Sequence, residues 1–140
     1  MTGADIVAAA RTHMGTPWVH QGRTPGVALD CAGLVICVAR QLGLVPPDMD
    51  VNGYTREADG SMLAWCDEHM TRIADLELGA VIVVVCDRQP QHMGIVGDYR
   101  HGGWSLIHGA SLAGRVVETR LMWARNMRLV AVYRMPGVGA

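Results

Sequence analysis

The hydrophobic pattern of the chain changes its period about half-way along. Up to about residue 70 the apolar residues recur at helical spacing, whereas five later segments are short, rich in Val and Ile, and separated by Gly, Pro, Asn or Asp. These segments span 80–86, 92–97, 104–108, 115–120 and 127–134. Helices followed by closely spaced strands predict an α+β fold with a roughly five-stranded antiparallel sheet. The 140 residues, half of them hydrophobic, predict one domain over 1–140.

Three helices are predicted in this first part of the chain, and two of them lie at its two ends. Thr2 can cap the first helix, with Asp5 as its capping-box partner, and Gly15 lies beyond its end. The other spans 61–70, with Ser61 as its expected N-cap. Among the strands, segment 80–86 is apolar throughout, so we expect it in the centre of the sheet with both faces covered.

The remaining helix follows a loop over 15–29 that contains three Gly and two Pro. Asp30 is a good N-cap, and Gly43 marks the end of the helix. Its apolar stripe consists of Leu34, Val35, Val38 and Leu42. Because the pattern is complete at both ends, this is the most clearly indicated element of the chain.

Charge and composition disfavour several classes of partner. The net charge is −1 and no basic run could neutralise a row of phosphates, which disfavours nucleic acid. The longest apolar run has seven residues, against the roughly 20 that span a bilayer, so we expect no membrane partner. Met1 to Met14 lacks the pattern of a secretory signal, and the cysteines are expected as free thiols. We therefore expect synthesis in the cytoplasm.

Cys31 is the first candidate for chemistry, because it lies in the first turn of the capped helix. The helix dipole and the unpaired N–H groups there should lower the pKa of a thiol and could also stabilise an oxyanion. This predicts a nucleophile. The alternative is a buried cysteine that serves as a small hydrophobic residue.

Two histidines could complete a catalytic set with Cys31. A hairpin centred on Arg100 would place His92 directly opposite His108, with Cβ atoms about 5 Å apart. Cys31 would attack, His92 would take and return the proton, and His108 would fix the tautomer of His92. A register slip of one residue would instead place the two histidines on opposite faces of the sheet.

Four motifs together resemble the NlpC-type family of papain-like cysteine peptidases, which cut the peptide stems of bacterial cell walls. They are GTPW at 15–18, DCAGLV at 30–35, HMGI at 92–95 and IHGAS at 107–111, in the order of the family. The resemblance implies a papain-like fold, with the helix of the nucleophile packed on the sheet. It further implies Cys31 as nucleophile, His92 as base, His108 as third polar residue, and no metal or other cofactor.

The resemblance also implies a substrate, the peptidoglycan stem peptide, by analogy cut between γ-D-glutamate and the diamino acid. We expect Trp18, His20 and Asp30 to contribute to substrate binding. The sequence HQGR at 20–23 is similar to that of small family members found with phage tails and gene-transfer particles. This similarity implies phage tail proteins as partners, and it implies that the protein is part of a virion or is released by lysis.

The chain departs from the family pattern at three positions. Trp18 stands where Tyr is usual, and indole cannot replace a phenol hydroxyl in kind. Ala32 stands where a Ser usually follows the nucleophile, and Ala80 where an Asp usually opens the first strand. We expect the first two changes to affect specificity for the stem peptide.

Other interpretations of the candidate residues and of the function remain open. Cys66 and His69 have C-x-x-H spacing and could form a zinc tetrad with Cys86 and His92, although both cysteines fall at predicted core positions. The same fold could serve a thiol acyltransferase or amidase, and a non-catalytic tail assembly protein could retain the scaffold. His13 is expected to be structural and His101 to be solvated.

Overall fold

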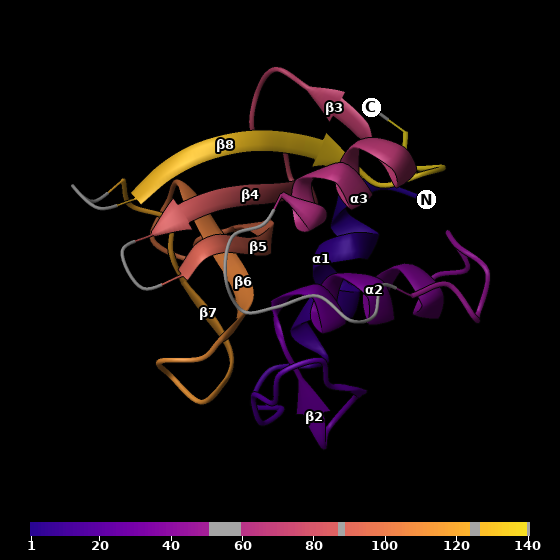
Figure 1. Ribbon diagram of the computed structural model, residues 1–140. Coiled ribbons are helices and arrows are strands. Elements are labelled where there is room, and N and C mark those ends of the chain that lie inside the picture. Colours follow the sequence, from indigo (N-terminus) through magenta and orange to yellow (C-terminus); the bar gives the residue numbers. More distant parts are fainter. Residues whose placement is uncertain (51–59, 87–88, 124–126, 140) are drawn as a thin grey trace.

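The computed structural model describes residues 1–50, 60–86, 89–123 and 127–139, and within them it contains three helices and two antiparallel sheets (Figure 1). The helices are α1 (Gly3–Arg11), α2 (Cys31–Gln41) and α3 (Ser61–His69). The main sheet has the order β3-β8-β4-β5-β6-β7. Its strands are β3 (Thr71–Ile73), β4 (Val81–Cys86), β5 (Gln89–Asp98), β6 (Trp104–Ala110), β7 (Arg115–Arg120) and β8 (Met127–Arg134). The predicted α+β class is confirmed.

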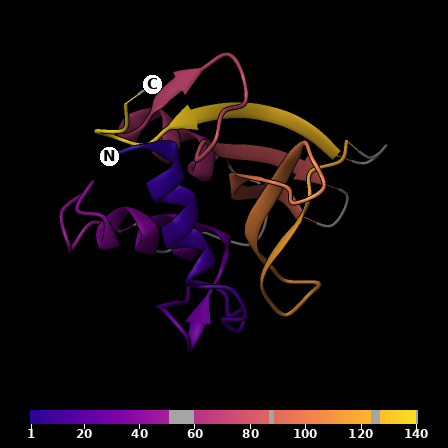
Figure 2. The same cartoon turned by 180° about the vertical axis from the view of Figure 1, so that it is seen from behind.

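Helices α1 and α2 pack on each other and against β5 (Figure 2). The Thr2 backbone N–H donates to Asp5 Oδ2 at 2.9 Å, which confirms the predicted capping partner. Buried Ile6 and Ala10 turn the apolar side of α1 to the core. His13, beyond the end of α1, is buried with Nε2 2.8 Å from Gln41 Oε1 of α2, so it has the structural role expected of it.

Strand β4 lies inside the sheet, as its uninterrupted apolar sequence predicted. Val81 and Val83 join the core that contains the apolar residues of α1 and α2, whereas Ile82 and Val84 join a second cluster. Successive residues of a strand point to opposite faces, so both faces of β4 are covered. The side chain of Cys86, at the end of this strand, lies outside the described residues.

The sheet has six strands where the sequence predicted five, and the additional strand is β3. Its three residues, Thr71 to Ile73, form no apolar run and pair with β8 through Thr71 opposite Arg134 and Ile73 opposite Val132. The preceding helix also differs, because Ser61 is its first residue and Gly60, at a φ of 83°, is the N-cap. Glycine adopts this left-handed conformation without a steric penalty.

The loop before α2 contains a short hairpin, in which β1 (Arg23–Thr24) pairs with β2 (Ala28–Leu29). The hairpin lies apart from the main sheet, on the side of α2 that faces away from α3 (Figure 1). Among the described residues, no helix has both the length and the apolar character required to cross a bilayer.

Candidate active site

The two predicted histidines are in direct contact. His92 Nε2 lies 2.7 Å from His108 Nδ1, and the rings meet edge to face with centroids 4.9 Å apart. The β5–β6 register, with Ile95 opposite Ile107 and Asp98 opposite Trp104, centres the hairpin on residue 101. The predicted centre at Arg100 was therefore wrong. Because the resulting shift between the strands is two residues, both histidines still share one face of the sheet.

The contact of His108 continues to β7, where His108 Nε2 lies 3.3 Å from Thr119 Oγ1. His108 is opposite Val117 in the register, and Thr119 is two residues further on the same face. Thr119 was not among the predicted site residues, although it lies in the predicted strand 115–120, which follows that of His108 in the sequence. A His92 that donates from Nε2 leaves its Nδ1 as the base, and His108 can then donate to the Thr119 hydroxyl oxygen.

Cys31 is the first residue of α2 and remains partly exposed. The N-cap carboxylate of Asp30 fixes its backbone, because Oδ1 accepts from Gly33 N–H at 2.7 Å and Oδ2 accepts from Gln21 N–H at 2.8 Å. Gly109 packs against the same backbone: a Cβ there would lie 2.7 Å from the carbonyl carbon of Asp30. The residue after His108 is therefore held against the residue before the nucleophile.

Comparison with solved structures gives the same architecture. The NlpC/p60 domain of the peptidoglycan hydrolase SagA matches with a TM-score of 0.62 at 23% identity, over 96% of this chain and 100% of that one. NlpC2 from Trichomonas vaginalis matches with a TM-score of 0.66 at 18% identity, over 96% and 46%. The chain has the NlpC/p60 fold.

An N-acetylmuramoyl-L-alanine amidase from Bacteroides uniformis is also similar, with a TM-score of 0.64 at 12% identity over 96% of this chain and 98% of that one. No family model matches the sequence. No curated protein matches it either. The assignment of the NlpC/p60 fold therefore rests on structural similarity to proteins of low sequence identity.

Within the NlpC/p60 fold, the Cys31 thiol does not have the lowered pKa that its position predicted. Burial, followed by the Asp30 carboxylate, raises its pKa to about 11. Hydrogen bonds from the backbone N–H groups of Met93, Ala32 and Cys31 itself act in the opposite direction but are outweighed. The prediction was wrong because it considered the helix end without the protein packed around it. The contact with Met93 also places the thiol beside the residue that follows His92.

The histidines are neutral as well. Burial, followed by the neighbouring His108, lowers the pKa of His92 to about 3, and burial lowers the pKa of His108 to about 4. At neutral pH the site therefore holds a thiol and two uncharged imidazoles.

These lowered pKa values predict a specific loss of stability in acid. Below pH 6.5 an unfolded histidine takes up a proton, whereas folded His92 and His108 stay neutral until about pH 3 and pH 4. The unfolded state then binds more protons, so the free energy of unfolding should fall as pH falls, by up to about 1.4 kcal/mol per pH unit for each histidine. Urea unfolding between pH 7 and pH 5 measures the slope.

The variant His92→Gln should show a shallower slope over this range, because it removes one of the two groups. His101 lies exposed in the turn between β5 and β6, as expected. Equal slopes for the wild-type protein and His92→Gln would contradict the proposed cause.

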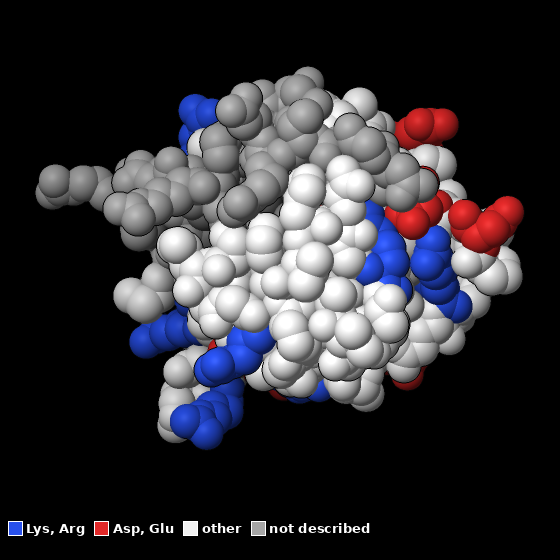
Figure 3. Space-filling view, turned by 60° about the horizontal axis from the view of Figure 1, so that its bottom comes forward, with Lys and Arg blue, Asp and Glu red and all other residues white. Residues whose placement is uncertain are grey.

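The residues predicted to bind substrate lie in or next to the 15–29 loop. Trp18 is half-buried, and its backbone N–H donates to the Gly114 carbonyl oxygen at 2.8 Å, in the turn that follows the strand of His108. His20 is half-buried, and the neighbouring Val19 is exposed. The face on the hairpin side has a broad area without charged side chains, bordered by basic side chains and, on the right of the view, also by acidic ones (Figure 3). Substrate contacts of Trp18 and His20 stay predictions.

Asp30 has a different place from the one expected of a substrate ligand. It is 2% exposed, and its two carboxylate oxygens accept hydrogen bonds from the backbone N–H groups of Gly33 in α2 and Gln21 in the preceding loop. A substrate contact would require the carboxylate to leave these partners. In this structure the carboxylate holds the backbone beside Cys31, and a substrate contact of Asp30 stays a prediction.

The alternative of a zinc site requires residues that lie in different environments in the structure. Cys66 is 0% exposed within the core cluster, and His92 faces His108. No group of three or more His, Cys, Asp or Glu residues in the described part of the chain could hold a metal ion. The side chain of Cys86 lies outside that part.

Proposed function

We propose that this protein is an NlpC-type cysteine peptidase that hydrolyses the peptide stems of bacterial peptidoglycan. The observation that carries the proposal is the placement of Cys31, at the start of α2, beside a strand whose His92 contacts His108 at 2.7 Å. The similar SagA domain belongs to a peptidoglycan hydrolase, and the Bacteroides uniformis protein is an amidase that acts on the same polymer. Both names support cell-wall hydrolysis.

The site supports acyl transfer through a thioester. His92 Nδ1 removes the proton from Cys31 as the sulfur attacks the carbonyl carbon of the stem peptide. The resulting oxyanion lies near the N-terminal end of α2, where backbone N–H groups favour negative charge. When the C–N bond breaks, the amine leaves with the proton returned by His92. Water, deprotonated by His92, then attacks the thioester, releases the carboxylic acid and restores the thiol.

His108 serves this cycle by keeping His92 in one tautomer. In the proposed tautomer His108 Nδ1, 2.7 Å from His92 Nε2, accepts its N–H hydrogen bond, so the lone pair of His92 Nδ1 stays available to the thiol proton. Neutral His108 can also accept a charge-assisted hydrogen bond from the imidazolium that forms during attack, whereas a protonated His108 would repel that cation and lower the pKa of His92. The buried position of His92 would otherwise make that cation costly.

For the scissile bond we propose the linkage between γ-D-glutamate and the diamino acid. An amidase that releases the whole stem is the second candidate, favoured by the structural likeness to the amidase from Bacteroides uniformis. Purified peptidoglycan digested with the protein and analysed by mass spectrometry separates the two. A new amino terminus on the diamino acid supports the first, and intact stems released from the glycan support the second. Sacculi that remain undigested would contradict both.

An acyltransferase would use the same thioester with an amine in place of water. Digestion in the presence of added amino acids tests this alternative, because amide products would appear beside the free acids. Association with phage tail proteins rests on residues 20–23 and stays a prediction, as does a non-catalytic assembly role. Turnover of sacculi by the purified protein would rule out the latter.

The role of His108 predicts a graded response to substitution. Asn can supply an oxygen that accepts from His92 Nε2, so His108→Asn should retain measurable kcat/KM, whereas His108→Ala should lose about 100-fold or more. The assay uses a defined stem peptide with and without a chelator. Equal loss in both variants, together with chelator sensitivity of the wild-type protein, would indicate a metal ligand instead.

A further inference from the structure

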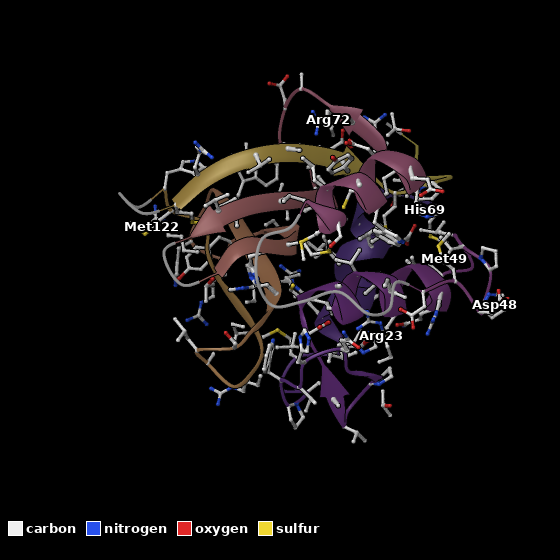
Figure 4. All side chains as sticks on the ribbon, in the orientation of Figure 1. Arg23, Asp48, Met49, His69, Arg72 and Met122 are labelled. Atoms are coloured by element: carbon white, nitrogen blue, oxygen red, sulfur yellow. The ribbon has the colours of Figure 1, made fainter. Side chains whose placement is uncertain are left out.

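Arg23 joins two aspartates next to the start of α2. Its Nη1 lies 3.1 Å from Asp30 Oδ1 and donates to the Gly22 carbonyl oxygen at 2.9 Å, while its Nε donates to Asp50 Oδ1 at 2.8 Å. The side chain is 12% exposed and that of Asp30 is 3% exposed. Figure 4 shows Arg23 between α2 and the β1–β2 hairpin. This is a largely desolvated ion pair, which depends strongly on both partners.

The position of Asp30 makes this pair relevant to catalysis. The oxygen that meets Arg23 is the one that accepts from Gly33 N–H, so a single carboxylate oxygen joins the arginine to the first turn of α2. Asp30 directly precedes Cys31, and attack on a substrate places negative charge first on the sulfur and then on the oxyanion. A carboxylate next to Cys31 whose charge is not compensated would oppose the development of negative charge in both steps.

We propose that Arg23 is a positioning residue for the nucleophile, which holds Asp30 against the first turn of α2 and neutralises its charge beside the Cys31 thiol. The inference rests on the proposed function where it is tested by enzymatic activity. Its test by the reactivity of the Cys31 thiol is independent of that function.

Further contacts hold Arg23 in this place. Cys37 of α2 donates its thiol hydrogen to the Arg23 carbonyl oxygen at 3.5 Å, which ties the backbone of residue 23 to the helix. Asp50 Oδ2 lies 3.4 Å from Arg40 Nη2, and Arg40 also donates to the Met49 carbonyl oxygen. Arg40 therefore belongs to the same cluster through Asp50, and it is the natural control for an effect specific to Asp30.

The groups that face the thiol determine how the effect can be measured. Asp30 adjoins it in the chain, Cys66 of α3 is near enough for Cys31 to raise its pKa, and His92 belongs to β5 beside it. Burial raises the pKa of Cys66 to about 12 and lowers the pKa of His92 to about 3, so both are neutral at pH 8. Asp30 is the negatively charged member of this set, and a change in its compensation should alter the thiolate fraction of Cys31.

The test is the rate at which iodoacetamide alkylates Cys31 at pH 8, followed by mass spectrometry of the peptide that contains it. The rate is proportional to the thiolate fraction. Arg23→Gln should react about tenfold more slowly than the wild-type protein, the effect of one pKa unit. Arg23→Lys retains the charge without the planar fork and should lie between the two. Arg40→Gln should stay within about twofold of the wild-type rate.

The double variant Arg23→Gln with Asp30→Asn separates electrostatics from structure. It has no carboxylate to compensate, and the amide oxygen can still accept from Gly33 N–H, but the amide NH2 cannot accept from Gln21 N–H. The single variant Asp30→Asn measures that loss by itself, so the alkylation rate of the double variant should recover to that of Asp30→Asn. A structural role alone would give no recovery. Circular dichroism and the melting temperature identify folded variants, and Arg23→Lys with the double variant decide the question if Arg23→Gln is unfolded.

Three results would overturn the inference: an unchanged rate in folded Arg23→Gln, an equal loss in Arg40→Gln, or no recovery in the double variant. In the activity assay, Arg23→Gln should lower kcat about tenfold with little change in KM, because misplacement of the reacting atom affects the chemical step. If the wild-type protein digests no peptidoglycan, the proposed function fails, and the alkylation result still decides the role of Arg23.

Discussion

Replacement of Cys31 with alanine should abolish hydrolysis of peptidoglycan and leave the fold intact. The sulfur is the atom that forms the thioester, so its removal should lower kcat by about 10⁴-fold or more. The residue is partly exposed at the first turn of α2, and loss of one sulfur atom there should change the melting temperature by only a few degrees. Release of soluble stem fragments from sacculi and a thermal melt measure the two effects.

Cys37 provides the matched control, because it lies on the same helix but is 6% exposed within the core. Cys37→Ala should reduce stability through lost packing and retain most of the activity of the folded fraction, because it removes only a weak thiol hydrogen bond to the Arg23 carbonyl oxygen. Brief iodoacetamide treatment should also modify Cys31 before Cys37 or Cys66, since the latter two are buried. Hydrolysis that persists in Cys31→Ala would refute the assignment of the nucleophile.

Replacement of Gly33 with alanine should destabilise the protein by about 3 kcal/mol, as expected for an overpacked, closely fitted contact. A Cβ at this position would overlap the Gly22 carbonyl oxygen and lie 3.1 Å from Arg23 Nη1. The backbone of residue 22 has little room to move away, because its own Cα faces the Ala28 carbonyl group. Activity should fall as well, since the same shift would disturb the Asp30 cap.

The direction of this effect opposes helix propensity, which favours alanine over glycine by about 1 kcal/mol. Urea unfolding of Gly33→Ala therefore gives a clear sign. Gly139→Ala is the control, because the nearest atom to its Cβ would be the Met1 carbonyl oxygen at 4.0 Å. Stability of Gly33→Ala equal to or above that of the wild-type protein would show that the hairpin does not press on α2 as described.

The sequence by itself determined the features that depend on neighbours along the chain. The cap of α2 at Asp30 and the capping partner Asp5 follow from short-range hydrogen bonding, and the central place of β4 follows from its uninterrupted apolar run. The shared face of His92 and His108 was predicted with the wrong hairpin centre. It survived because the side-chain period of a strand is two residues and the shift was also two.

The tertiary structure decided whatever depends on segments distant in the sequence. Strand β3 exists through its pairing with β8, and Thr119 meets His108 through the β6–β7 register. The pKa of Cys31 was predicted to fall and instead rises to about 11, because burial outweighs the local field of the helix end. The sequence places a dipole beside the thiol, whereas desolvation depends on how the rest of the chain packs around it.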